Sequence, residues 1–559
     1  MWPCCLWLHR CVIYSSSMNP AVNKYVRIER EAESTDRQHT HRPSPQSSFS
    51  LFCYSPILAM PSSATTTTEG YAYAVKTGIL SQGLTTESVK PSSLPADVSY
   101  DVIVIGAGFC GLSAARDMSL AGKKVLLLEA RDRIGGRTWS AKALDHTYEM
   151  GGTWVHWLQP HVWAEITRYG LASSIKESSG MSKDAVCSYA IGSRGKFTVD
   201  DPAVIDKRLL PLIAKFMDCD GEGGRSLFPQ PFLPLENRRI WSKYDMSLRA
   251  RADQLDISDE DKELLLLFLN INSLSAPTTS SYLNFHRLYA LSNYDFNCFM
   301  EICGKFKFKH GTTQLASYMF DEFSGTTQFK EAVKSITTKP HEVDVTTTSG
   351  KSFRASNVIC TVPLHCLSDV EFSPPLPAAW TTTRHANMGG KVHIHVQEKV
   401  PAWFGLRDET ANVSALFTES PSSAGGTHMV SFAMSEGMIA QDHLKAKPSA
   451  YLEAATADVT PPGLNISPTH MFWHDWVRDE FAKGAWASHQ PGTLSKGLGQ
   501  MMNKPQVTER LYMANADWAN GWVGYIDGAI EMGRRAAREI AVKSQAISTA
   551  QSWPPTARM

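Results

Sequence analysis

Three glycines and one carboxylate are spaced for binding a dinucleotide. Gly106, Gly108 and Gly111 fit the pattern G-x-G-x-x-G between a β-branched run, residues 101–105, and an Ala-rich stretch of helical composition. Glycines at these places allow a tight turn, close approach of the backbone to a pyrophosphate and close helix–strand packing. The N-terminus of the helix offers free N–H groups to the phosphates. Glu129 follows at about the 20-residue spacing expected of the acceptor for an adenosine ribose hydroxyl.

Arginines and more glycines come directly after Glu129. Arg131 and Arg137 flank Gly135 and Gly136, and Gly151, Gly152 and Thr153 follow. Arginine is a bidentate phosphate donor, and glycines let the backbone pass close to an extended ligand. Each arginine alone is more simply explained as a solvated surface residue. NAD and FAD share the first half of such a site, so the turn by itself does not decide between them.

Three blocks of sequence resemble the flavin-containing monoamine oxidase family, and most of all its soluble fungal members. They are EARDRIGGRTW at 129–139, GGTWVH at 151–156 and GWVGYIDGAIEMGRRAAREI at 521–540. The resemblance runs from about residue 99 to about residue 541 and implies FAD as the cofactor. It implies contacts from Gly106, Gly108, Gly111, Glu129, Ala130, Arg131, Gly136 and Arg137 to the ADP half and pyrophosphate, from Gly151, Gly152 and Thr153 beside the flavin, from Val333 at the adenine, and from Asp517, Ile526 and Ala529 near the last helix.

Two positions depart from the family pattern. Asn515 follows Ala514 where the family has Ala-Gly, so backbone approach at that point is in doubt. Asp517 stands where the family commonly has Glu.

The resemblance also assigns catalytic residues. Trp486 and Tyr525 stand where the family has the aromatic pair that forms a cage at the flavin, and ring faces of this kind guide an amine lone pair. Lys391 matches the lysine that assists the reaction with oxygen. Without a catalytic role, Trp486 and Tyr525 would be aromatic residues of the core, and Lys391 would be an exposed lysine on a strand. Ala485 precedes Trp486 where membrane-bound animal relatives carry the cysteine that attaches flavin, so we expect non-covalent FAD.

The implied activity is oxidation of primary monoamines to imine and aldehyde, with O₂ reduced to H₂O₂. A polyamine or L-amino-acid oxidase of the same clan is one alternative. A flavoprotein that binds a partner with little turnover is another. Tyr244, Met246, Phe296, Phe308 and Trp403 are aromatic or apolar residues that could line the substrate pocket or pack the core. His393 and His395 form an H-x-H pair with Lys391 on one face of a strand, but no third ligand lies nearby, so we expect no metal.

The elements that position these residues predict an α/β fold. We expect a Rossmann-like FAD-binding domain assembled from discontinuous segments, 99–181, 307–363 and 476–543. Segments 182–306 and 364–475 form an α+β substrate domain with a mixed sheet and helices. Apolar or alternating runs predict strands at 124–129, 342–348 and 357–362, and helical patterns cover 260–269 and 528–541. Residues 1–98 are expected to be disordered or a gene-model artefact, and 544–559 to be a flexible tail.

Composition excludes several partners. Lys plus Arg and Asp plus Glu both number 55 in 559 residues, which gives no electrostatic footprint for nucleic acid or acidic membranes. No run reaches the ~18 apolar residues of a membrane span, so no anchor is expected. The 11 cysteines follow neither a disulfide nor a zinc spacing. Ala557-Arg558-Met559 fits the pattern of C-terminal peroxisomal signals, so we expect binding to the import receptor and a soluble peroxisomal protein, with the cytoplasm as the alternative.

Overall fold

The apolar runs on either side of the glycine-rich turn become neighbouring parallel strands. β5 (Tyr100–Ile105) and β6 (Val125–Leu128) pair from Val102–Val125 to Ile105–Leu128, and α1 (Phe109–Leu120) connects them. Every residue of β6 is buried, as expected of a parallel strand covered on both faces. This confirms the predicted strand–turn–helix–strand unit.

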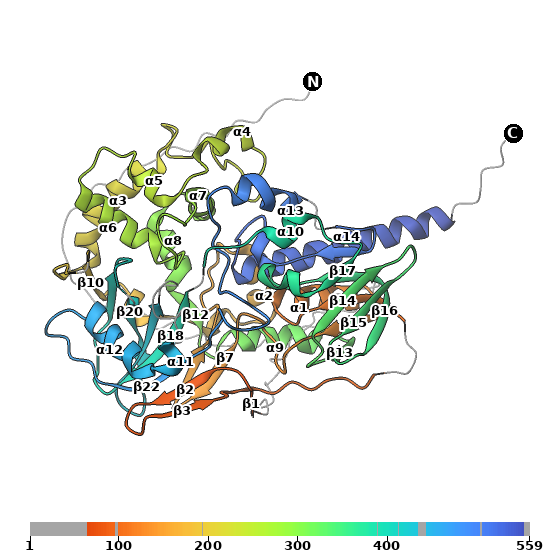
Figure 1. Ribbon diagram of the computed structural model, residues 1–559, viewed down its shortest axis with the longest axis horizontal. Helices are drawn as coiled ribbons and strands as arrows, with labels where there is room; N and C mark the ends of the chain where they lie inside the picture. The colour runs from red at the N-terminus through yellow and green to blue at the C-terminus, as the bar shows by residue number, and fades with distance from the viewer. Residues whose placement is uncertain are drawn as a thin grey trace, which may run out of the picture. The chain divides into compact units, whose positions relative to one another are not determined.

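The computed structural model describes residues 64–94, 99–192, 194–387, 389–411, 413–433, 443–503 and 506–552. All of them belong to the unit Pro61–Met559, and Figure 1 labels many of its helices and strands. The predictions for residues 1–63, and the peroxisomal tripeptide at the C-terminus, lie outside the described residues.

The first large sheet gathers strands from distant parts of the chain around β5. It has eight strands in the order β13-β6-β5-β16-β15-β14-β17, with β23 paired to β16. β16, β5, β6 and β13 run parallel, and β14, β15 and β16 are antiparallel. The bounds of the remaining strands are β13 (Thr326–Gln328), β14 (Val333–Thr338), β15 (Val343–Thr347), β16 (Ser352–Cys360), β17 (Glu371–Ser373) and β23 (Leu511–Met513). β17 lies within the segment predicted for the substrate domain, yet it pairs with β14 here.

The second large sheet has nine strands in the order β11-β10-β19-β20-β21-β18-β22-β2-β3. It is mixed, because β10 and β19 are parallel while β18, β20, β21 and β22 pair antiparallel. Its strands are β2 (Tyr71–Ala74), β3 (Ile79–Gln82), β10 (Val186–Ala190), β11 (Thr198–Asp200), β18 (Gly390–Val396), β19 (Trp403–Arg407), β20 (Val413–Pro421), β21 (Thr427–Ala433) and β22 (Pro468–Trp473). Together the two sheets confirm the predicted fold class.

The N-terminal segment 64–94 corrects the expectation that residues before 99 have no structure. β2 pairs with β22 at the edge of the second sheet, and the ring of Tyr71 stacks on Trp473 with centroids 5.3 Å apart. β1 (Ala64–Thr66) and β4 (Thr85–Glu87) join β7 (Ser140–Ala143) and β8 (His146–Glu149) in a four-stranded sheet. Short edge strands take their order from the neighbour with which they pair, so composition gives little sign of them.

Helices cover the sheets and surround the substrate side. α14 (Ile526–Ser552) runs alongside α1 and α2 in Figure 1. A Cβ built on Gly533 would stand 2.1 Å from the carbonyl oxygen of Cys110. α14 extends to Ser552, so the predicted flexible tail begins too early at residue 544. The remaining helices are α2 (Pro160–Arg168), α3 (Pro202–Met217), α4 (Arg238–Trp241), α5 (Leu248–Ala252), α6 (Asp259–Asn270), α7 (Tyr282–Leu291), α8 (Phe296–Gly304), α9 (Thr312–Glu322), α10 (Ala378–Thr382), α11 (His443–Ala446), α12 (Pro448–Val459) and α13 (Gly499–Asn503). No described helix combines the length and apolarity of a membrane span.

Candidate cofactor and active site

One cavity collects most of the predicted site residues. Its volume is about 630 Å³, and its lining comes from the turn after β5, the loop after β6, β18 and the segments on both sides of β23. The predicted residues that line it are Gly106, Gly108, Glu129, Ala130, Arg131, Gly136, Arg137, Gly151, Gly152, Thr153, Val333, Lys391, Trp486, Tyr525, Ile526 and Ala529. Gly111 and Asp517 do not line it. Gly111 packs against the carbonyl of Gly106, and Asp517 accepts a hydrogen bond from Arg137.

The glycine turn has the conformation its sequence pattern requires. Gly106 has φ +102°, a left-handed value that side chains rarely adopt. A Cβ on Gly111 would stand 1.8 Å from the carbonyl oxygen of Gly106, so Gly111 allows α1 to pack on the turn rather than touching a ligand. Gly108 is the N-cap of α1 and offers no side-chain cap, which leaves the first N–H groups of the helix free for phosphate oxygens.

Glu129 lies at the end of β6, where it was predicted. Its Oε2 accepts a hydrogen bond from the backbone N–H of Ala107 at 2.6 Å, and its Oε1 accepts from the N–H of Arg131 at 2.9 Å. Burial raises the pKa of this carboxyl. The carboxylate therefore ties the glycine turn to the following loop, and its remaining lone pairs can accept a ribose hydroxyl.

Arg131, which the sequence predicts to be a phosphate donor, lines the cavity and is also paired with carboxylates of the protein. Its guanidinium donates to both carboxylate oxygens of Asp479, at 2.8 and 2.6 Å, and to Glu69. Both anionic partners come from other parts of the chain, so this side chain is already committed inside the protein.

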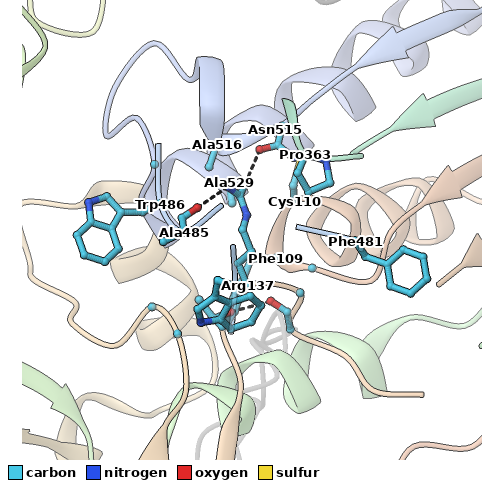
Figure 2. A pocket seen from close by; sticks show the side chains of 18 of the residues that line it. Phe109, Cys110, Arg137, Pro363, Phe481, Ala485, Trp486, Asn515, Ala516 and Ala529 are labelled. Carbon is cyan, nitrogen blue, oxygen red and sulfur yellow. Dashed lines mark hydrogen bonds between the residues drawn. The ribbon is translucent and has the colours of Figure 1, made fainter. Parts of the chain in front are cut away.

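Arg137 is the arginine that the structure places between the two halves of the site. Its Nη1 donates to the carbonyl of Ala485 at 3.1 Å, and its Nη2 donates to Asn515 Oδ1 at 2.9 Å and Asp517 Oδ1 at 2.7 Å. Figure 2 shows the guanidinium between Ala485 and Asn515. Although burial opposes it, Arg137 holds the pKa of Asp517 below its usual range. Asp517 therefore orients Arg137 instead of touching the cofactor.

Asn515 stands where the family has the glycine of its Ala-Gly pair, and it lines the cavity. Its backbone is extended, with φ −164°, a conformation that any residue adopts. The amide accepts from Arg137 Nη2 and from the N–H of Asp517 at 3.1 Å, and donates to the carbonyl of Thr361 at 2.7 Å. The asparagine thus joins the loops after β16 and β23 to Arg137.

Lys391 is buried beside the predicted flavin-proximal glycines. Its Nζ donates to the carbonyl of Gly151 at 2.6 Å and to Thr153 Oγ1. Burial lowers the pKa of Lys391 to about 8, with Lys307 acting in the same direction and Glu149 and Glu419 opposing it. The residue can thus exchange a proton near neutral pH. His393, two positions along β18, bonds the carbonyl of Glu149 at 2.8 Å, so it has a structural partner.

Trp486 and Tyr525 both line the cavity but are anchored differently. Trp486 Nε1 donates to the carbonyl of Asn272 at 3.1 Å, and its ring meets Phe432 edge-on at 6.2 Å and 86°. The Tyr525 hydroxyl lies 3.2 Å from Cys303 Sγ, and burial raises its pKa well above the usual value, so it stays protonated. Trp486 and Phe481 point to opposite sides in Figure 2.

Aromatic and apolar side chains form the part of the cavity that we call the chamber. They touch one another through the rings of Trp154, Phe417 and Phe432 and through Phe404 on Phe417. Besides Lys391, Trp486 and Tyr525, the chamber residues are Trp154, Met181, Ile271, Asn272, Met300, Cys303, Gly304, Phe404, Phe417 and Phe432. Tyr244, Met246, Phe296, Phe308 and Trp403 are not part of the cavity lining. Residue type alone could not separate the two sets, because both are apolar and from the same segments.

The charged part of the cavity lies at the glycine turn and fits the ADP half of FAD. Its ionisable lining residues are Glu129, Arg131, Arg137, Glu331, Lys334, Asp369, Glu480 and Lys483. A free helix N-terminus, a ribose acceptor and a long cavity that ends in an aromatic chamber are the features a flavin dinucleotide needs. Glycines 106 and 108, Glu129, Arg137 and Val333 would hold the ADP half, and Gly151, Gly152, Thr153 and Ile526 would lie along the flavin.

The dinucleotide-binding sheet shares a cavity with a second, mixed sheet, an arrangement that suits an oxidoreductase with a dinucleotide cofactor. The sequence matches the flavin containing amine oxidoreductase family over residues 109–541, and the chain belongs to that family. It is therefore an FAD-dependent amine oxidoreductase, and the resemblance drawn from the three sequence blocks is confirmed.

Relatives and solved structures agree with this assignment. The chain is 31% identical over 467 residues to pseudooxynicotine dehydrogenase of Pseudomonas sp, with 82% of this chain and 89% of that protein covered. It is 23% identical over 478 residues to a flavin-containing amine oxidase of Oncorhynchus mykiss, with 82% and 89% covered. The structure of wild-type putrescine oxidase bound to putrescine covers 80% of this chain and 99% of its own, at 22% identity and a TM-score of 0.66, and shows the same fold.

Proposed function

We propose that the protein oxidises primary monoamines with aliphatic or arylalkyl chains to imines, which hydrolyse to aldehydes, and reduces O₂ to H₂O₂. The observation that carries this proposal is the chamber. Among its described residues Lys391 is the one with an ionisable charge, and its Nζ is bonded to Gly151 and Thr153. Apart from the amide of Asn272 and the hydroxyl of Tyr525, the remaining side chains are aromatic or apolar, which suits a substrate with a single amine and an apolar body.

Bound FAD supplies the acceptor for a hydride equivalent from the carbon next to the amine. The residues of the chain prepare that transfer. Trp486 and Tyr525 offer ring faces that orient a neutral amine and narrow its approach. The bond of Trp486 to Asn272 fixes one of these walls. Lys391 holds a proton at Nζ near neutral pH, and its bonds to Gly151 and Thr153 keep it beside the segment that follows β8.

The two enzymatic alternatives need groups that the chamber does not offer. A polyamine carries a second ammonium, which requires a carboxylate, and an amino acid carries a carboxylate, which requires an arginine or lysine pair. The carboxylates of the cavity lining are Glu129, Glu331, Asp369 and Glu480, all in its charged part. In the chamber a polyamine therefore has no carboxylate for its second ammonium. An amino acid has the single lysine Lys391, whose Nζ already donates to Gly151 and Thr153.

A second candidate is favoured by the relatives named for nicotine derivatives. One is pseudooxynicotine dehydrogenase, and another is the nicotine dehydrogenase of Pseudomonas putida, at 28% identity over 484 residues. A chamber rich in aromatic rings would also accept a cyclic or N-methylated amine attached to an aromatic ring. The word dehydrogenase in these names raises the question of an electron acceptor other than O₂.

A substrate panel tests the proposal directly. Purified holoenzyme is given n-alkylamines, benzylamine, putrescine, spermidine, L-amino acids and nicotine, and peroxide and O₂ uptake are measured in parallel with reduction of an artificial acceptor without O₂. We expect peroxide from the first two. Turnover of putrescine or amino acids above the monoamines contradicts the proposal, and acceptor reduction without peroxide contradicts the role of O₂. Yellow enzyme that turns over none of them points to a partner-binding flavoprotein.

We also propose that FAD is held without a covalent bond. Ala485 stands beside Trp486, and its carbonyl accepts from Arg137. Acid precipitation of the holoenzyme should leave the flavin in the supernatant, and yellow colour in the pellet contradicts this proposal.

For localisation we propose the peroxisome, on the sequence of the last three residues. A fluorescent protein fused to the N-terminus should be punctate and become diffuse when Ala557–Met559 is deleted. An unchanged pattern after the deletion rejects the proposal in favour of the cytoplasm.

A further inference from the structure

A network of buried charges joins the N-terminal segment to the cofactor site. It consists of Glu69, Arg131, Arg133, His474 and Asp479, and we call it the Glu69 network. Glu69 contacts both guanidiniums. Arg131 donates to Asp479 at 2.8 and 2.6 Å, and His474 Nε2 bonds Asp479 Oδ2 at 2.6 Å.

The charges within the network balance only when Glu69 is present. The side chains of Arg131, Arg133 and Asp479 are 5%, 2% and 4% exposed, and that of Glu69 is 15% exposed. Burial lowers the pKa of His474, which leaves it neutral at pH 7. Without the Glu69 carboxylate, Arg133 would lose the carboxylate that bonds it and keep only the unbonded charges of Glu129, Asp479 and Asp132. Taking a partner from a buried charge costs more than the pair itself contributes.

Arg133 transmits this contact to the dinucleotide turn. Its Nη1 donates to the carbonyl of Gly136 at 2.8 Å. A Cβ built on Gly136 would stand 3.2 Å from Gly108 Cα, and the N–H of Gly135 donates to the carbonyl of Ala107 at 2.9 Å. The glycine turn that would meet the pyrophosphate is therefore three contacts away from Glu69, through Arg133 and Gly136.

A second contact runs beside the first. Thr67 Oγ1 donates to Asp132 Oδ1 at 3.0 Å. Residues 67–69 therefore contact the loop 131–133 at three side chains, those of Arg131, Asp132 and Arg133. Asp479 lies in the segment that leads to Ala485 and Trp486, and the network thus also links the loop after β6 to that segment.

A bound cation is a poorer explanation of the same cluster. Ligand atoms of Glu69, His474 and Asp479 lie within 4.8 Å of one another, which could suit a metal ion. However, Arg131 and Arg133 already place positive charge at these carboxylates, and a metal ion there would be repelled.

We propose that Glu69 is a positioning residue of the FAD site, through which residues 64–94 hold the loop 131–137 against the glycine turn. The N-terminal segment is then part of the cofactor-binding apparatus rather than an extension that can be removed. This inference concerns the cofactor and does not depend on which amine is the substrate.

The test is E69Q in the full-length holoenzyme, with E87Q as the matched control. Glu87 is in the same segment, but its carboxylate accepts from the neutral Ser317 hydroxyl at 2.9 Å. We expect E69Q to release FAD about tenfold more readily on dilution and ultrafiltration. Flavin fluorescence should rise on heating before the far-UV circular dichroism signal is lost. Added FAD should restore kcat. E87Q should behave as wild type.

Three outcomes overturn the proposal. The first is unchanged or tighter FAD retention in E69Q, and the second is equal weakening of FAD retention in E87Q. The third is that flavin release and loss of the far-UV circular dichroism signal occur at the same temperature in E69Q. If E69Q does not accumulate, T67V provides a milder version. It removes the hydroxyl that donates to Asp132 and accepts from the backbone N–H of Glu69, and it keeps every charge. We expect T67V to weaken FAD retention in the same direction by a smaller factor, and no change in it contradicts the proposal equally.

Discussion

The charged part of the cavity and the chamber are built in different ways. At the glycine turn, residues close in sequence make contacts close in space, as when Glu129 bonds Ala107 and Arg131. In the chamber, Met181, Cys303, Phe417 and Trp486 come from four separate parts of the chain. Binding a pyrophosphate requires the same glycine-rich turn in many dinucleotide-binding proteins. An apolar substrate chamber requires only side chains that together give a suitable shape. The first region therefore fixes the cofactor, and the second decides which amine is oxidised.

Lys391→Met is the strongest test of the division, because Lys391 belongs to the chamber but supplies a charge. Loss of a proton donor or acceptor at the reacting groups lowers turnover by about 10³-fold. We expect this loss in the peroxide assay with FAD still bound at full occupancy. Lys334→Met, at the charged part of the same cavity, should change turnover little. Equal losses in the two variants would break the comparison.

These two regions also differ in how far sequence alone could predict them. Gly106, Gly111 and Glu129 follow from spacing, since a strand, a turn and a helix fix their places locally. The bonds from Arg137 to Asn515 and Asp517 join residues 378 and 380 positions apart. The resemblance to a family, not periodicity, pointed to Arg137 and Asp517, and nothing in the sequence pointed to the bonds between them. The pairing of Arg131 with Glu69 could not be predicted, because Glu69 lies in a segment whose composition hides its strands. Chamber residues such as Met181 and Cys303 carried no signal that distinguishes them from core.

The pKa of Lys391 differs between the folded and the unfolded chain, so this residue makes the stability of the fold depend on pH. Its pKa is lowered from 10.5 to about 8 by burial, so the folded protein binds fewer protons than the unfolded chain between these pH values. Stability from this group therefore rises as pH increases from about 8 to 10.5, by about 3 kcal/mol in all. Urea unfolding of wild type and Lys391→Met at pH 7.5 and pH 10 isolates the effect as the difference between proteins. A pH-independent difference would falsify the desolvated lysine.

Asp517→Asn probes the charged part of the cavity without touching the cofactor. The carboxylate is fully buried and accepts from Arg137 Nη2 at 2.7 Å and from the N–H of Leu364 at 2.9 Å. The substitution keeps the size and removes the charge, so Arg137 loses its anion and FAD affinity falls by about 2 kcal/mol, or tens of fold. Fluorescence of released FAD measures this loss. Glu331→Gln is the control, because Glu331 lines the same part but pairs with the half-exposed Lys351. A lower kcat at saturating FAD would place Asp517 in the chemistry instead.

The smallest effect is expected where the chamber holds Tyr525. A thiol is a weak hydrogen-bond partner, and Cys303 Sγ lies 3.2 Å from the tyrosine hydroxyl. Cys303→Ala, Tyr525→Phe and the double variant form a cycle in which kcat/KM for one alkylamine is measured. We expect each single change to lower kcat/KM by about threefold or less, and the double change to add little, because the second substitution removes a contact already lost. The apolar wall supplied by the ring survives in all three. Additive losses would mean that the hydroxyl and the thiol act separately, and a large loss in Tyr525→Phe alone would move specificity from the shape of the chamber to a polar contact.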